Sequence, residues 1–193
     1  MSIKIRLIIM NFLQFAVWGA YLTSMGSYLV NVGLHEHIGM FYAMQGIVSL
    51  FMPAVLGIIA DRWIPAQKLL SFSHFTAALF MAAAGYYGMT KGADVDFGTL
   101  FTLYSLSVAF YMPTLALSNS VAYTALDKAG LDTIRTFPPI RIFGTIGFIC
   151  SMWVVDLLGL QNNYGQFFAC AIIGVAYGVY AVSYTHLRAH ETS

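Results

Sequence analysis

Apolar residues fill six long stretches of the chain, and short polar segments separate them. The stretches cover residues 7–30, 38–60, 69–89, 97–125, 138–158 and 166–182. A membrane-spanning helix needs about 20 largely apolar residues. The pattern therefore predicts an all-α membrane protein with six transmembrane helices packed as one bundle.

The composition favours a bilayer as the solvent. Of the 193 residues, 59% are hydrophobic and only 9% are charged, against roughly 25% charged in a soluble domain. The few Lys and Arg residues are scattered singly, so the chain lacks the basic face that binding to nucleic acid requires. Cys150 and Cys170 lie in apolar stretches without metal-ligand spacing, which predicts small buried side chains.

The distribution of Lys and Arg predicts the orientation in the membrane. With the N-terminus inside, the cytoplasmic segments hold six of these residues, and the opposite side holds Lys91. The six are Lys4, Arg6, Arg62, Lys68, Lys128 and Arg135. Cytoplasmic loops carry the excess of positive charge, so we expect a multi-pass protein of the cell inner membrane with a cytoplasmic N-terminus.

The last residues, 183–193 (SYTHLRAHETS), break the apolar pattern abruptly. They resemble translated sequencing-adapter read-through. We therefore expect residues 1–182 to form the six-helix bundle, residues 183–193 to be a non-native tail, and a second half of the protein to be missing. The alternative is a native polar tail.

A glycine and an acid lie four residues apart where the second stretch ends. Gly57 and Asp61 therefore share one helical face, and Arg62 follows. A glycine on such a face lets a neighbouring helix approach closely. The segment resembles the Gly-x-x-x-Asp-Arg motif of the major facilitator superfamily, which implies a latch between access states. The continuation 64–67 (IPAQ) departs from that family's usual glycine and basic residues.

The fifth stretch carries a polar and aromatic stripe. Arg141, Thr145 and Phe148 follow one another at i, i+4 and i+7 and so lie on one helical face. An arginine inside a membrane span is costly unless it faces a partner or a watery cavity. A guanidinium, a hydroxyl and an aromatic ring in succession suit a flat ligand that bears hydroxyl groups. Gly144 and Gly147 lie on other faces, where they allow close helix packing.

Two interpretations of Arg141 remain open on the residues alone. If the helix begins at Pro138, the guanidinium can extend to the cytoplasmic headgroups. If the helix begins near Asp132, Arg141 lies deeper and faces a cavity.

Four segments together resemble the bacterial nucleoside:H+ symporter family of the major facilitator superfamily. They are residues 12–23 (FLQFAVWGAYLT), 51–61 (FMPAVLGIIAD), 111–115 (YMPTL) and 138–141 (PPIR). The resemblance extends over residues 1–182 and implies the N-terminal six-helix half of a twelve-helix transporter. It also implies uptake of nucleosides with protons by alternating access, without a cofactor and with the proton as coupling ion.

The resemblance implies a role for the stripe as well. Arg141 and Thr145 would contact polar groups of the nucleoside, and Phe148 would pack on it. The expected partners are a nucleoside, the lipid bilayer and the missing C-terminal six-helix half. Residues of that second half would supply the remaining contacts and the protonatable groups.

Other polar and aromatic residues in the apolar stretches allow two interpretations each. His74 can be a proton relay or, as we favour, a hydrogen-bonded packing residue. Gln14 and Gln45 can line the cavity or bridge helices with their amides. Trp18 can stack a base or serve as a packing residue.

Two further classes of function stay open. A different small polar substrate, such as an oligosaccharide or an organic anion, would also suit an arginine beside aromatic rings. A membrane-embedded enzyme or an assembly subunit is the more remote alternative, because an enzyme needs a constellation of catalytic groups near one membrane face. The acids Asp61, Asp94, Asp96, Asp127, Asp132 and Asp156 are scattered along the sequence, so we expect no enzyme.

Overall fold

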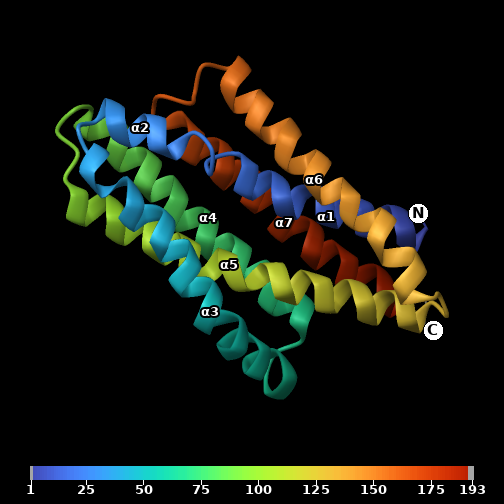
Figure 1. The fold of residues 1–193 in the computed structure, drawn as a ribbon. Coiled ribbons are helices and arrows are strands. Elements are labelled where there is room, and N and C mark those ends of the chain that lie inside the picture. The colour runs from blue at the N-terminus through green and yellow to red at the C-terminus, as the bar shows by residue number, and fades with distance from the viewer. Residues whose placement is uncertain (1, 191–193) are drawn as a thin grey trace.

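The computed structural model describes the main chain of residues 2–190 and the side chains of residues 2–182, and the regular secondary structure of this part is all helical (Figure 1). A 3-10 turn, His35–His37, precedes the third helix. The α-helices are α1 (Ile3–Gly19), α2 (Met25–Asn31), α3 (Ile38–Arg62), α4 (Ala66–Lys91), α5 (Phe97–Lys128), α6 (Thr133–Leu157) and α7 (Gly165–His190). The start of α1 and the end of α7 lie at the same end of the bundle (Figure 1), as an even number of crossings requires.

The helices match the predicted spans, with one difference at the first. In the described part of the chain, α3, α4, α5, α6 and α7 are each long and apolar enough to cross a membrane. The predicted first span is instead divided into α1, of 17 residues, and α2, of 7 residues. The all-α fold is confirmed, and the unbroken first helix was wrong.

The break between α1 and α2 has a local cause. Gly19 ends α1 and packs against the Phe148 main chain of α6, and a glycine within a helix is destabilising by roughly 0.5–1 kcal/mol relative to alanine. The freed Leu22 carbonyl accepts a hydrogen bond of 2.8 Å from the Tyr42 hydroxyl of α3. Because Met25 N still donates to the Tyr21 carbonyl across the break, the two helices continue one another as one crossing.

The helices pack as one closed bundle. The most extensive contacts run in the order α6, α1, α7, α4, α5 and α3, and further contacts of α5 with α1 and α6 close the bundle, with α6 and α3 on opposite sides (Figure 1). Helices α3 and α6 are the least buried of the five long spans: 17% of the apolar segment of α3 and 28% of that of α6 are buried, against 50% or more in α4, α5 and α7. The bundle therefore leaves one face of α3 and one face of α6 without a helical neighbour.

Two apolar clusters form the core, and a polar layer lies between them. One cluster gathers around Tyr21, Tyr104 and Phe167, and the other around Leu70 and Tyr177. In α1, α4 and α5 the residues between the two clusters are Gln14, His74 and Thr114, all of them buried. Gln14 Nε2 donates to Thr114 Oγ1 at 2.8 Å, and Gln14 Oε1 lies 3.1 Å from His74 Nε2. Amides and hydroxyls here join three helices, as expected in a bilayer.

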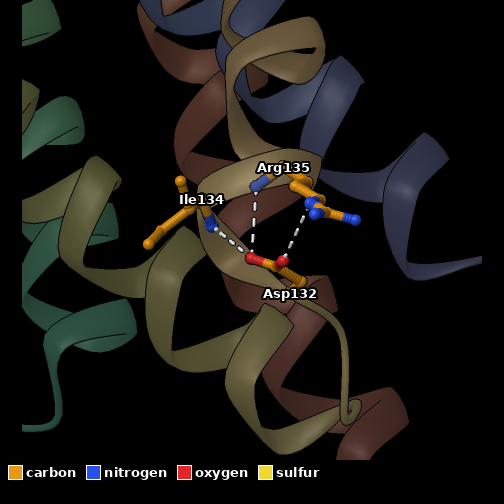
Figure 2. A network of polar contacts seen from close by, with 3 residues as sticks. All are labelled: Asp132, Ile134 and Arg135. Atoms are coloured by element: carbon orange, nitrogen blue, oxygen red, sulfur yellow. Dashed lines mark hydrogen bonds and ion pairs between the residues drawn. The ribbon is translucent and has the colours of Figure 1, made fainter.

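The start of α6 is set by a capping aspartate. Figure 2 shows Asp132 Oδ1 accepting hydrogen bonds from the main-chain nitrogens of Ile134, at 2.9 Å, and Arg135, at 3.2 Å. The Arg135 side chain also lies 3.5 Å from Asp132 Oδ2. An aspartate at this position satisfies main-chain donors that the first turn leaves unpaired. The predicted start of the fifth span at Pro138 was therefore wrong, and the alternative start near Asp132 is confirmed.

Helix α7 extends to His190 in the described main chain. Residues 191–193 and the side chains after Val182 lie outside the described part of the structure. The division into a bundle of residues 1–182 and a non-native tail of residues 183–193 therefore stays a prediction.

Candidate substrate site

The predicted stripe lies on α6, one of the two least buried spans. Arg141 and Phe148 are half-buried and Thr145 is exposed. Arg141 lies eight residues after Thr133, the first residue of α6. At 1.5 Å per residue this places it about 12 Å into the helix. The stripe therefore begins well inside the span, on a side of α6 that the described helices leave partly open.

The guanidinium of Arg141 points away from the start of α6. Its Cζ atom lies 3.8 Å from the centroid of the buried Phe15 ring of α1. Its terminal nitrogen lies 2.8 Å from the position that a Cβ on Gly144 would occupy, one turn further along α6. A side chain that extended to the cytoplasmic headgroups would point the other way. The geometry therefore favours the cavity interpretation over the headgroup interpretation.

Arg141 has no ion-pair partner in the described residues. Its guanidinium is stabilised instead by a cation–π contact with the face of the Phe15 ring. A cation over an aromatic ring contributes on the order of 0.5–2 kcal/mol, more where water is excluded. The N–H donors of the guanidinium stay available to a ligand. The sequence interpretation missed Phe15, although it lies three residues before Trp18 and so on a neighbouring part of the same face of α1.

Three glycines bring α1 and α6 into direct contact behind the stripe. A Cβ on Gly144 would lie 2.7 Å from the Phe15 ring, and a Cβ on Gly147 would overlap the Phe12 main chain. From the other helix, a Cβ on Gly19 would overlap the Phe148 carbonyl. The predicted close packing at Gly144 and Gly147 is confirmed. This contact brings the main chain of the stripe directly against α1.

An aromatic wall stands beside the stripe, formed by Phe15, Trp18 and Phe148. The Trp18 and Phe148 rings meet edge to face, with centroids 6.0 Å apart, and the Phe15 and Trp18 centroids lie 6.3 Å apart. Trp18 Nε1 donates a hydrogen bond of 2.8 Å to Gln45 Oε1 of α3. The candidate site therefore combines one cation, one hydroxyl and three aromatic rings, a set whose chemistry suits a flat, polar, uncharged or anionic small molecule.

Comparison with known proteins places the chain in a family. The sequence model described as "Nucleoside H+ symporter" matches residues 1–193. The chain belongs to the nucleoside H+ symporter family. This confirms the resemblance found in the sequence.

Relatives of this family give the same result. The chain is 40% identical to a xanthosine permease of Escherichia coli over 188 residues, which cover 95% of the chain and 43% of the permease. It is 39% identical to the nucleoside permease NupG of Escherichia coli over 191 residues, which cover 97% of the chain and 44% of the permease. The chain therefore spans about half the length of these relatives.

The solved structures agree with the fold. The crystal structure of the nucleoside transporter NupG superposes with a TM-score of 0.85 at 36% identity, over 95% of this chain and 44% of that one. The bundle is therefore equivalent to about half of a major facilitator superfamily transporter. Because the family is one of symporters, the chain belongs with transporters and not with enzymes. In the described residues no group of three or more His, Cys, Asp or Glu side chains could hold a metal ion.

His74 lies in the polar layer described above, and its ring meets the Tyr111 ring edge to face. It is fully buried, its ring stacks on the Tyr177 ring with centroids 4.0 Å apart, and its Nε2 pairs with Gln14 Oε1. Its Nδ1 has no hydrogen-bond partner in the described residues. Gln14 and Gln45 both bridge helices. This arrangement matches the packing interpretation of the histidine.

The predicted latch residues lie at the end of α3. Asp61 and Arg62 are exposed, and a Cβ on Gly57 would meet no atom within 4 Å. Gly57 and Asp61 line a groove of about 370 Å³ between α3 and α5, whose opposite side is formed by residues such as Ser120 and Thr124. The close helix approach expected at Gly57 is therefore absent from the described residues, and an open groove takes its place.

Proposed function

We propose that this chain supplies one six-helix half, the N-terminal one, of a transporter that takes up nucleosides together with protons by alternating access. The observation that carries the proposal is membership of the nucleoside H+ symporter family over the whole chain. Two permeases that share 39–40% identity with it are named for xanthosine and for nucleosides. The second half would close the cavity opposite α3 and α6, the two helices with free faces.

Arg141, Thr145 and Phe148 are the residues that we propose bind the substrate. A nucleoside offers a flat base and a ribose with hydroxyl groups. The guanidinium of Arg141 can donate to a base carbonyl or a ribose oxygen, and the exposed hydroxyl of Thr145 can donate or accept one turn further along. The ring of Phe148 can pack on the base, since an aromatic ring stacks on any nucleobase, whichever hydrogen-bond donors and acceptors that base carries.

The electrostatics of the site suit a neutral substrate with exposed oxygens. Arg141 is the one charged side chain of the stripe, and no carboxylate pairs with it in the described residues. Its donors are therefore free for a ligand, while the cost of desolvating the guanidinium is offset in part by Phe15. An organic anion or an oligosaccharide would use the same donors, and for that reason the substrate class needs a direct test.

The coupling ion in this proposal is the proton, and no cofactor takes part. The protonatable group is expected in the second half, because the stripe and the aromatic wall contain no acid and His74 is enclosed in the polar layer. The expected location is the cell inner membrane, with the N-terminus in the cytoplasm, because the short segments on that side carry most of the Lys and Arg.

We further propose that Gly57, Asp61 and Arg62 act as a conformational latch. Asp61 and Arg62 lie exposed at the end of α3, and the groove beside Gly57 is open. A second access state in which α3 and α5 approach one another would fill that groove, and only a small residue at position 57 would allow it.

The function is tested by uptake of radiolabelled uridine. The complete transporter is expressed in cells that lack their own nucleoside uptake, and uptake is measured with and without a protonophore. We expect uptake that the protonophore abolishes and that unlabelled nucleosides, but not sugars or organic anions, compete away. A well-expressed protein that takes up no nucleoside would overturn the proposal.

A further inference from the structure

A buried glutamine on α3 is bound to the aromatic wall. Gln45 is only 6% exposed, and its Oε1 accepts the indole N–H of Trp18 at 2.8 Å. The indole nitrogen can only donate, so the amide must present its oxygen to Trp18. The orientation of the amide group is therefore determined by Trp18.

The other end of the amide has a neighbour on a third helix. With its oxygen on Trp18, the amide directs Nε2 toward the Tyr104 hydroxyl of α5, and this contact falls short of a well-formed hydrogen bond. A weakly paired buried donor costs stability, and most buried polar groups in native proteins avoid it. A leucine or methionine at position 45 would remove the cost. The amide is therefore explained better by its contact with Trp18 than by packing.

Trp18 in turn contacts the proposed substrate residue. Its ring meets Phe148 edge to face with centroids 6.0 Å apart, while Trp18 itself is only half-buried. An indole that is fixed at its N–H end and touches Phe148 at its ring limits the orientations of the Phe148 ring. The contacts form one line across three helices, from Gln45 of α3 through Trp18 of α1 to Phe148 of α6.

We propose that Gln45 is a positioning residue of the substrate site, which holds the Trp18 indole against Phe148 and so fixes the aromatic wall on which the nucleobase packs. The inference rests on the proposed function and adds two residues to its site. Gln45 acts through Trp18 and does not itself contact the substrate, because its side-chain nitrogen is buried.

A double-mutant cycle tests this inference in the complete transporter. Gln45→Met removes the acceptor with an unbranched side chain of similar length, and Trp18→Phe removes the donor but keeps an aromatic ring. The concentration dependence of uridine uptake gives KM, which does not depend on the amount of protein in the membrane, and Vmax is normalised to that amount.

We expect each single variant to raise KM by about 3- to 10-fold with little change in normalised Vmax, which corresponds to one lost neutral hydrogen bond. The double variant should match the more affected single variant, because both remove the same bond. Ser49→Ala is the matched control: its hydroxyl donates to the Gln45 main-chain carbonyl one turn along α3, and not to the wall. Its KM should equal that of the parent protein.

Three results would overturn the inference. The first is an unchanged KM in Gln45→Met or in Trp18→Phe. Trp18→Phe leaves the amide in place and serves as the test if Gln45→Met does not fold. The second is a double variant whose KM is the product of the two single effects. The third is no uridine uptake by the parent protein, which overturns the proposed function as well, whereas normal parental uptake with an unchanged KM in the variants overturns this inference alone.

Discussion

Replacing Gly147 by alanine places a methyl group where the main chain of α1 lies. The new Cβ would overlap the Phe12 carbonyl group, and the atoms that it meets are all main-chain atoms of Phe12. Main chain cannot rotate aside as the end of a flexible side chain can. Helices α1 and α6 would therefore have to separate along the whole contact that supports Arg141 and Phe148.

The expected cost follows from this geometry. Forcing an extra carbon into a well-packed helix contact costs about 1–3 kcal/mol, and the alanine regains roughly 0.5–1 kcal/mol through its better helix propensity. A net loss of about 1–2 kcal/mol remains. For a domain of this size, each kcal/mol lowers Tm by about 2–4 °C, so we expect a fall of about 2–8 °C.

Gly57→Ala is the matched control for this prediction. Gly57 also lies inside a helix, but an added Cβ there meets no atom within 4 Å. Only the gain in helix propensity applies, so Tm should stay the same or rise slightly. Circular dichroism of the purified protein in detergent, followed during heating, measures both variants. A Tm for Gly147→Ala equal to or above that of Gly57→Ala would refute the close contact between α1 and α6.

Three further predictions concern other parts of the bundle. Asp132→Ala should lower Tm by about 2–4 °C, because loss of a helix N-cap costs about 1 kcal/mol, while Asp132→Asn, which can still accept from the main chain, should lose less in the same melting experiment. His74→Leu should lower Tm by leaving Gln14 Oε1 unpaired, at a cost of about 1–3 kcal/mol, while uridine uptake stays sensitive to a protonophore; a normal Tm with uptake that no longer responds to the protonophore would make the histidine a proton relay instead. Gly57→Leu should leave Tm nearly unchanged and reduce Vmax of uptake, since the groove must close during transport; unchanged Vmax would remove Gly57 from the latch.

The sequence was sufficient for most of the fold because hydrophobic length is the main constraint in a bilayer. Six stretches of about 20 apolar residues can cross only as helices, and the structure has a helical crossing at each. The break after Gly19 was not predictable, because it depends on the contact between Gly19 and α6 and on the Tyr42 hydroxyl of α3. Neither contact is visible in the local sequence.

The site was predictable in part. The i, i+4, i+7 spacing on α6 was enough to place Arg141, Thr145 and Phe148 on one face. The depth of Arg141 depended on whether α6 begins at Pro138 or near Asp132. Pro138 and Pro139 favoured a start at Pro138, which was wrong. Proline is favoured in the first turn of a helix, but the capping bonds of Asp132 set the start five residues earlier than Pro138.

The aromatic wall could not be predicted from the sequence alone. Phe15, Trp18 and Gln45 lie on two helices whose rotation about their axes is fixed by packing against other helices. An apolar helix in a bilayer gives little sign of which face is buried, since lipid and protein interior are both apolar. The pairing of Trp18 with Gln45 and of Phe15 with Arg141 therefore needed the structure.

The most direct test of the account compares two arginines at the same end of α6. Arg141 lies over Phe15 inside the span, while Arg135 is 89% exposed and pairs with Asp132 in the first turn. Uridine uptake by the complete transporter is measured for Arg141→Ala and Arg135→Ala at equal membrane abundance. We expect Arg141→Ala to raise KM at least about 10-fold, as loss of a charged hydrogen bond of about 1.5–3 kcal/mol requires, and Arg135→Ala to leave KM unchanged. Equal KM values for the two variants would contradict the placement of Arg141 in the substrate site.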